Sequence, residues 1–149
     1  MGELSIKQLD KKEIGGALDL VWNVFLEYEA PDYTQEGIET FYKSIHEENY
    51  LSMLSVYGTF IGEELVGVIA ARNGGKHIAL FFVDGKHHRQ GIGKQLFKAV
   101  QKEEMTVNSS LYAVPIYHRF GSKDTGTEQA VNGVRFIPME LRRCHPCNG

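Results

Sequence analysis

The stretch that most constrains this chain is His88–Lys94, with the sequence HRQGIGK. It follows a strand-like apolar run, His77–Val83, with the sequence HIALFFV. It precedes a segment in which apolar residues recur with helical spacing, at Ile92, Leu96, Ala99 and Val100. The first N–H groups of a helix have no acceptor within the helix, and the helix dipole adds partial positive charge there. A basic loop between a strand and a helix therefore predicts a site for a phosphorylated ligand.

The residues of this loop suit an anion but match neither common phosphate motif. Gly91 and Gly93 let a phosphate approach the backbone without a Cβ in the way, and Arg89 and Lys94 add positive charge. A Walker loop needs four residues between its first glycine and its Gly-Lys-Ser/Thr end, whereas one residue separates the glycines here. A dinucleotide-binding fingerprint needs a third glycine where Leu96 stands. Binding of another nucleotide nevertheless remains an alternative at this point.

The spacing of the loop resembles the acetyl-CoA pyrophosphate loop of the Gcn5-related N-acetyltransferase (GNAT) superfamily, Gln/Arg-x-x-Gly-x-Gly/Ala, with His88 at the first position. A later stretch, AVPIYHRFG, resembles the Ala-x-x-x-Tyr-x-x-x-Gly-Phe motif of the same superfamily. Ala113, Tyr117 and Gly121 keep its spacing, and Ser122 stands where phenylalanine is usual. Because the two motifs occur in the right order and at the right separation, the resemblance covers nearly the whole chain.

Composition sets the class of protein. The chain has 149 residues, of which 42% are hydrophobic and 23% charged, as in a single soluble globular domain. A net charge of −3 shows no footprint of a nucleic-acid partner. No stretch approaches the ~20 apolar residues of a membrane span, and the N-terminus has no apolar signal core. We therefore expect a cytoplasmic protein without a membrane partner, and a homodimer is left open.

The rest of the chain alternates between strand and helix patterns. Strands are expected at about 4–9, 54–61, 65–72, 77–83, 105–109, 125–130 and 134–141. Helices are expected at about 14–28, 35–45, 92–100 and 110–120, with Ile38, Phe41, Tyr42 and Ile45 on the buried face of the second. These patterns alone predict a mixed α/β domain with a largely antiparallel sheet.

Local signals mark several boundaries. Asp10 and Glu13 resemble a capping box, Pro31 interrupts the first helix, and Thr34 is placed to cap the second. Turns are expected at 73–75 and 132–133, and Gly121 is expected to stop the last helix. The resemblance implies an α/β (α+β) GNAT-like acyl-CoA N-acyltransferase fold. It would be one domain over residues 1–149, with a mostly antiparallel mixed sheet of about seven strands, about four helices and a flexible tail at 142–149.

The resemblance also implies which residues bind acetyl-CoA, the acyl donor. Backbone N–H groups of the glycine loop would hold the pyrophosphate, and the edge of the preceding strand would pair with the pantetheine arm. The N–H of Val83 would polarise the thioester carbonyl. Asn108 and Ser110 could bond the pantetheine amides, although Ser110 could instead cap a helix. The implied set is Phe82, Val83, His88, Arg89, Gln90, Gly91, Ile92, Gly93, Lys94, Asn108 and Ser110.

Tyr117 is the residue to which the resemblance assigns side-chain chemistry. When an amine attacks the thioester directly, coenzyme A leaves as a thiolate, and a phenol with a pKa near ~10 can protonate a thiolate with a pKa of about 8.5. The alternative is an ordinary helix tyrosine that packs against the sheet. A general base must also take the proton of the amine, and Glu27, Glu29 and Asp84 remain open for this role.

The first two helices would border the acceptor pocket in the resembled fold. Trp22, Glu27, Tyr28, Glu29 and Asp84 are the candidates for binding the acceptor, with Asp32 and Tyr33 nearby. Carboxylates beside aromatic rings suit a cationic amine, such as a polyamine, an aminoglycoside-like compound or an amine of a peptide. The alternative is an acidic, solvated helix face.

Two further hypotheses concern the end of the chain and the activity of the protein. Cys144 and Cys147 form only half of a zinc site, so we expect no metal and a reduced tail without a role. The leading hypothesis is an acetyl-CoA-dependent N-acetyltransferase acting on a primary amine of a small molecule or peptide. The alternative is a non-catalytic acyl-CoA-binding or regulatory domain, to which the departures at His88 and Ser122 lend weight.

Overall fold

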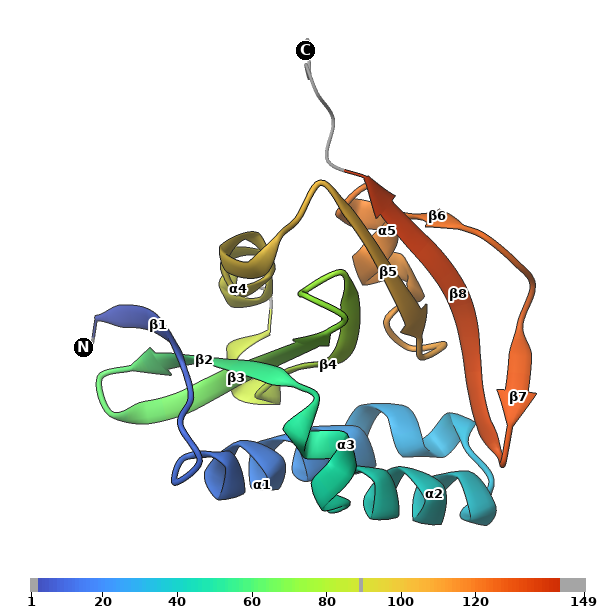
Figure 1. The fold of residues 1–149 in the computed structure, drawn as a ribbon, viewed down its shortest axis with the longest axis horizontal. Helices are drawn as coiled ribbons and strands as arrows, with labels where there is room; N and C mark the ends of the chain where they lie inside the picture. Colours follow the sequence, from blue (N-terminus) through green and yellow to red (C-terminus); the bar gives the residue numbers. More distant parts are fainter. Residues whose placement is uncertain (1–2, 89, 143–149) are drawn as a thin grey trace, which may run out of the picture.

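A mixed β-sheet forms the centre of the computed structural model, which describes residues 3–88 and 90–142. Within these residues eight strands pair in the order β1-β2-β3-β4-β5-β8-β6, with β7 pairing on β8 (Figure 1). Every pairing is antiparallel except that of β4 with β5. The strands are β1 Leu4–Gln8, β2 Ser55–Ile61, β3 Glu64–Arg72, β4 His77–Val83, β5 Glu104–Ser109, β6 Lys123–Asp124, β7 Gln129–Val131 and β8 Val134–Arg142.

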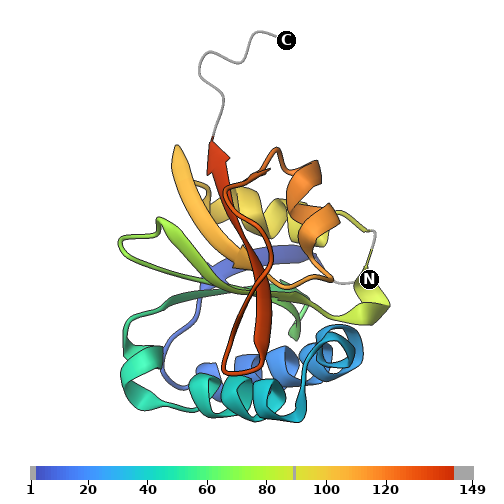
Figure 2. The ribbon, with the colours of Figure 1, turned by 90° about the vertical axis from the view of Figure 1, so that its right-hand side faces the viewer.

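Helices cover both faces of the sheet. The α-helices are α1 Ile14–Val24, α2 Gln35–Ile45, α3 Glu48–Ser52, α4 Ile92–Val100 and α5 Val114–Arg119, and three short segments of other helix types are η1 Phe25–Glu29, η2 Ala30–Asp32 and η3 Gly85–His87. α1 and α2 lie on one face, and α4 and α5 on the other (Figures 1 and 2). Two apolar cores result, because alternate residues of a strand point to opposite faces: Val68 packs toward α1, whereas Ile69 packs toward α4.

The expected fold class is confirmed, and the corrections are local. Phe97 rather than Ala99 completes the buried face of α4, and Tyr42 of α2 is 46% exposed. The last helix begins at Val114 instead of Ser110, because residues 111–113 form a turn before it. Of the strand expected at 125–130, only residues 129–130 are strand, as part of β7, and the short β6 lies before it. Neither β6 nor α3 had been expected. No helix within the described ranges has the length and apolar character needed to cross a membrane.

The segment from Asp10 to Thr34 contains a capping box in the turn before α1, a change of helix type after Val24, and the residue that caps α2. Asp10 and Glu13 exchange the hydrogen bonds of a capping box, and Thr34 Oγ1 accepts from the N–H of Gly37 at 3.1 Å. After Val24 the helix widens into the π-helical η1, in which the N–H of Ala30 donates to the carbonyl of Phe25 five residues earlier. The wider turn brings Glu29 rather than Tyr28 into the interior.

The divergence of β4 from β5 creates the space for a site. The two strands pair only at His77–Thr106 and Ile78–Val107. Opposite β3, Leu80 faces Ala70 while Ile78 faces Ala71, so Ala79 is an extra residue in β4. Such a bulge bends its strand, and beyond it β4 leaves β5 and exposes an unpaired edge.

Candidate active site

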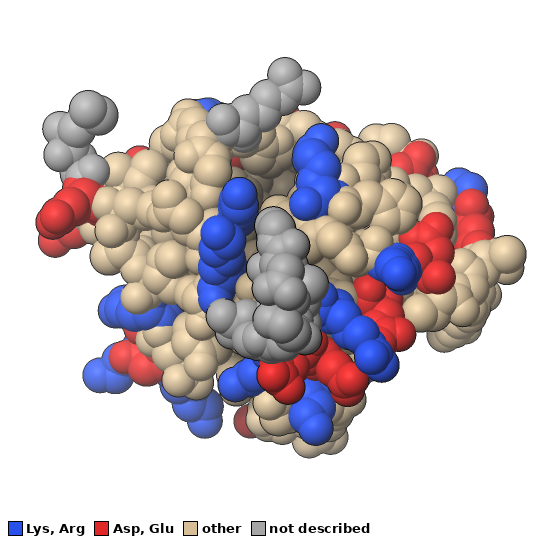
Figure 3. Space-filling view, turned by 90° about the horizontal axis from the view of Figure 1, so that it is seen from above, with Lys and Arg blue, Asp and Glu red and all other residues tan. Residues whose placement is uncertain are grey.

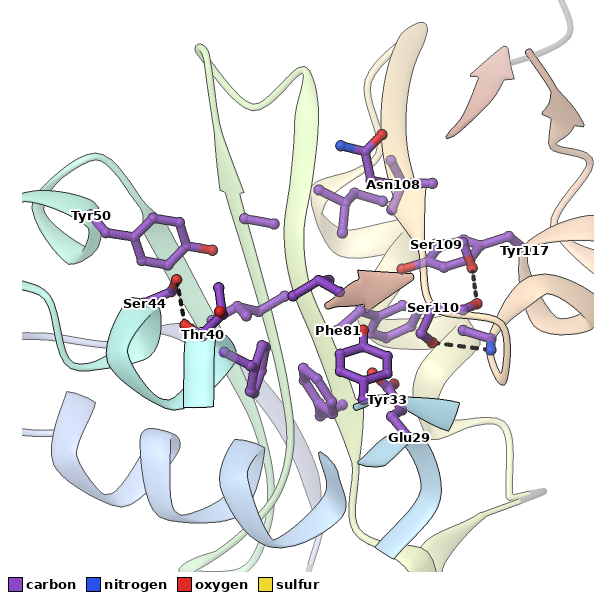
Figure 4. A pocket seen from close by; sticks show the side chains of 18 residues that line it. Glu29, Tyr33, Thr40, Ser44, Tyr50, Phe81, Asn108, Ser109, Ser110 and Tyr117 are labelled. Atoms are coloured by element: carbon purple, nitrogen blue, oxygen red, sulfur yellow. Dashed lines mark hydrogen bonds between the residues drawn. The ribbon is translucent and has the colours of Figure 1, made fainter. Parts of the chain in front are cut away.

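A pocket of about 210 Å³ lies where β4 and β5 diverge, on the side covered by α2. Its walls come from both strands, from η1, α2 and α3, and from the start of β8. Figure 4 shows Glu29 and Tyr33 from the first helical region, and Ser110 and Tyr117 from the segment after β5. The pocket thus brings together residues from Glu29 to Val134, which lie far apart in the chain.

Glu29 is a buried carboxyl group in the wall of this pocket. The residue is 8% exposed, and burial raises the pKa of Glu29 to about 7. The charge of Asp32 raises that pKa further, whereas a side-chain hydrogen bond with Ser110 lowers it. Ser110 Oγ also accepts from the N–H of Ala113 at 3.2 Å, which holds the hydroxyl in place. A carboxyl group that titrates near neutrality can take up a proton at physiological pH.

Tyr117, the tyrosine of the second motif, lies in the same buried region. It is 4% exposed, and its ring is 6.0 Å from that of Phe81 and 6.3 Å from that of Phe120. Burial raises the pKa of the Tyr117 phenol, and the nearby Glu29 carboxylate raises it further. Tyr117 therefore stays neutral and keeps its O–H as a donor. Phe120 also stacks on Phe97 at 4.8 Å. Ser122, which stands where phenylalanine is usual, is buried and donates to Met139 Sδ at 3.4 Å.

The unpaired edge of β4 presents the main chain of alternate residues. The N–H of Asp84 donates to the carbonyl of Val66 at 2.8 Å, and Phe82 lies opposite Val68. Hydrogen bonds alternate along an antiparallel pair, so the main-chain groups of Phe81 and Val83 point away from β3, toward the divergence. Of these two residues, Phe81 lines the pocket. The sequence argument named Phe82 and Val83 for the pantetheine contact, but the main-chain groups of Phe82 are directed to β3. It missed Phe81, which has the same parity as Val83.

The side chain of His88 makes contacts within the protein. Its Nε2 donates to the carbonyl of Val83 at 2.7 Å, and its ring lies 4.8 Å from that of Tyr28. Tyr28 in turn lies 5.3 Å from Tyr112. The side chain of His88 thus joins the end of β4 to η1.

The glycine loop leads into α4 as expected. Gly91 is in the left-handed region with φ +79°, and an added Cβ would meet no atom within 4 Å. The side chain of Ile92 is buried, so this residue can offer a ligand only its N–H, while Lys94 is exposed. Gln90 Nε2 donates to the carbonyl of Lys86 at 3.4 Å. Arg89 lies outside the described residues. Figure 3 looks onto the α4 side, where basic side chains lie among acidic ones.

The remaining candidate residues for the acceptor site lie in different parts of the structure. Trp22 stacks on Phe25 at 5.6 Å and lines a shallow groove between α1 and α2, away from the pocket. Glu27 is exposed, and the Asp84 carboxylate accepts from the N–H of Lys86 at 3.1 Å. The structure therefore places only Glu29, of the three candidate bases, in the wall of the pocket.

The pocket has further polar residues, of which Tyr33, Asn108 and Ser110 had been named from the sequence and others had not. Tyr33 lines it, and burial, with the charges of Glu29 and Asp32, raises the pKa of this tyrosine. Asn108 and Ser110 line it as well. The residues that the sequence argument missed come mainly from α2 and α3: Thr40, Ser44 and Tyr50. Small polar residues on an amphipathic helix are common on solvated faces, so no sequence signal distinguished these.

The described part of the chain contains no cluster of possible metal ligands. Among residues 3–88 and 90–142, no group of three or more His, Cys, Asp and Glu side chains is placed to hold an ion. Cys144 and Cys147 lie outside the described residues.

Comparison with known proteins identifies the family. The family model described as "Acetyltransferase (GNAT) domain" matches residues 29–143. The chain belongs to the GNAT acetyltransferase family. A search of curated proteins gave no match.

Solved structures with the GNAT fold cover nearly the whole chain. One is a GCN5-related N-acetyltransferase, named as a class-II aminotransferase, from Rhodopseudomonas palustris, with a TM-score of 0.81, 16% identity, and coverage of 96% of this chain and 98% of that one. The PaiA N-acetyltransferase from Thermoplasma acidophilum, in complex with coenzyme A, has a TM-score of 0.73, 18% identity, and coverage of 95% and 99%. An aminoglycoside 6'-N-acetyltransferase complexed with coenzyme A has a TM-score of 0.62, 14% identity, and coverage of 93% and 96%.

Proposed function

We propose that this protein transfers the acetyl group of acetyl-CoA to a primary amine by direct attack within a ternary complex. The observation that carries the proposal is the divergence of β4 from β5, which opens a pocket lined by both Glu29 and Tyr117. Two similar proteins are described as complexes with coenzyme A, which supports a donor of this type.

The described residues fit a coenzyme A donor. The N-terminus of α4 offers N–H groups without acceptors in the helix, and the open space around Gly91 leaves room for a pyrophosphate. Lys94 is exposed beside it, and Arg89 would add a second positive charge. The unpaired edge of β4 supplies main-chain donors and acceptors for the pantetheine amides. From this edge, the N–H of Phe81 or of Val83 would polarise the thioester carbonyl.

Each proton of the reaction has a candidate partner in the pocket. The amine nitrogen forms a bond to the carbonyl carbon as the carbon–sulfur bond breaks. We assign the proton lost by the amine to Glu29, whose pKa of about 7 makes it a stronger base than an ordinary carboxylate. The O–H of Tyr117 donates to the leaving thiolate. Burial raises the pKa of the Tyr117 phenol, and for the same reason it would make a thiolate that leaves into the pocket a stronger base.

Calorimetric titration with acetyl-CoA, with ATP and NADH as controls, tests the donor site. We expect saturable binding of acetyl-CoA alone, followed by amine-dependent release of coenzyme A in an assay for free thiol. Binding of ATP or NADH in preference to acetyl-CoA, or no binding at millimolar acetyl-CoA, would overturn the proposal.

A further inference from the structure

One side of the pocket is closed by the β7–β8 hairpin. Asn132 and Gly133 form its tight turn, with φ of +52° and +81°. The tip packs on α2 so closely that a Cβ on Gly37 would overlap the carbonyl of Gly133. Thr40 Oγ1 donates to the carbonyl of Asn132 at 3.1 Å. Figure 2 shows the hairpin reaching from the sheet to the helical layer on this side.

A second bond ties the hairpin to the first helical region. Arg135 Nη1 donates to the carbonyl of Asp32 at 3.2 Å, and Arg135 Nε donates to Glu128 at 2.8 Å. Val134, next to the turn, lines the pocket itself. A polypeptide that approached between α2 and β8 would have to displace these contacts.

The volume and the charges of the pocket restrict the acceptor further. About 210 Å³ is less than the roughly 300–1,000 Å³ of pockets for drug-sized ligands, and the acetyl group needs part of that space. Among the described residues that line it, Glu29 alone has a charged side chain. At the α3 end Tyr50 forms the wall, and the positive charge of Arg72 acts on it. The wall of the pocket therefore offers one carboxylate, that of Glu29, to an ammonium group, and the charge of Asp32 acts on the same end of the pocket. A second ammonium group toward Tyr50 would meet no carboxylate in the wall and would be repelled by Arg72.

We propose that the acceptor is a small free amine with a single positive charge, and not a polyamine, an aminoglycoside-like compound or an amine carried on a polypeptide. This inference rests on the proposed function and adds the class of acceptor to it.

Three amines with the same four-carbon arm test it. Butylamine carries one charge, putrescine adds a second ammonium at the far end, and a peptide with blocked termini and one lysine carries the same arm on a polypeptide. In the thiol-release assay we expect kcat/KM for butylamine to exceed that for putrescine by at least about tenfold, because a second buried charge has no partner. The lysine peptide should be poorer by a similar factor or more.

Gly37→Ala tests the closing contact, because its Cβ would force the hairpin away from α2. We expect the ratio of activity on the peptide to activity on butylamine to rise in this variant. Gly16→Ala is the matched control, since a Cβ at this exposed position of α1 meets no atom within 4 Å. Thermal unfolding of both variants shows whether each is folded.

The outcomes separate the two proposals. If acetyl-CoA does not bind, the proposed function fails. If acetyl-CoA binds but no amine is acetylated, the proposed transfer also fails. If amines are acetylated but putrescine or the peptide reacts as fast as butylamine or faster, the class of acceptor is wrong. The comparison on the wild-type protein decides this whether or not Gly37→Ala folds.

Discussion

At the scale of single residues, burial gives Glu29 its chemistry. Glu27, two positions earlier, is exposed and solvated by water. Glu29 is the last residue of η1 and lies buried in the wall of the pocket, so its carboxyl group loses most of that solvation. Its pKa near 7 makes it part proton acceptor and part neutral acid at physiological pH. The nearby Tyr117 stays neutral, so the pocket holds one group that takes a proton and one that donates.

The pH dependence of activity should report Glu29. We expect kcat/KM to rise with pH through an apparent pKa near 7, because only the ionised carboxylate accepts the proton of the amine. Glu29→Gln should lower kcat by roughly 10²–10⁴-fold and remove this limb of the profile. Glu27→Gln is the matched control and should leave the profile unchanged. A wild-type limb that persists in Glu29→Gln would assign it to another group.

Tyr117→Phe separates catalysis from binding. The variant keeps the buried ring and loses the O–H, so we expect kcat to fall by roughly 10²–10⁴-fold while the calorimetric Kd for acetyl-CoA changes little. Tyr57→Phe, in β2, provides the same chemical change away from the pocket. Unchanged turnover in Tyr117→Phe would instead support a structural tyrosine, and inactivity of the wild type with tight acetyl-CoA binding would support the non-catalytic alternative.

At the scale of secondary-structure elements, two irregularities make the site. The extra residue Ala79 bends β4 away from β5, and the π-helical η1 brings Glu29 inward at the end of α1. A regular strand would have continued to pair, and a regular helix would have presented a different residue. Between β4 and α4, Gly91 in the left-handed region turns the chain into the helix that offers its N-terminus to the donor.

Gly91→Ala should weaken acetyl-CoA binding through the backbone alone. The new Cβ meets no atom, so the cost is the left-handed conformation, about 1–2 kcal/mol. Relief of that strain would move the loop and raise the calorimetric Kd. Gly74→Ala, at φ +68° with equally open space in the β3–β4 turn, is the matched control. It should lose similar stability, measured by denaturant unfolding, and keep the wild-type Kd. Equal Kd values for the two variants would exclude the loop from the donor site.

At the scale of the whole molecule, the buried carboxylate of Glu29 lowers the folding stability at high pH. The pKa of Glu29 is about 7 in the folded protein against 4.5 for the ordinary group, so the folded state favours the protonated form. The contribution to stability is therefore fully present below pH 4.5 and is lost as the pH rises through about 7. The loss of folding stability amounts to as much as about 3 kcal/mol, because the pKa of Glu29 rises from 4.5 to about 7.

Glu29→Gln should therefore be more stable than the wild type above pH 7 and similar to it below pH 4.5. Urea unfolding at several pH values measures the difference in the free energy of unfolding between the two proteins. Taking the difference cancels the effects of other titrating groups, such as His77, whose pKa is lowered by burial and by Arg72. A difference that did not grow with pH would show that Glu29 is solvated in the folded protein.

The sequence by itself determined most of the order of strands and helices, apart from α3 and the short strands β6 and β7, together with the two motifs and the place of Tyr117 on the last helix. These features depend on local patterns: apolar periodicity, glycine, and caps such as Asp10–Glu13 and Thr34, which the structure contains as expected. Tertiary structure alone decided that Glu29, and not Glu27 or Asp84, lines the pocket, and that His88 binds the carbonyl of Val83. It also decided that Phe81 faces the gap and that the hairpin at Gly133 closes the pocket. The reason is physical: solvation and contact between residues distant in the chain depend on how bulged strands and widened helices pack, which no local spacing records.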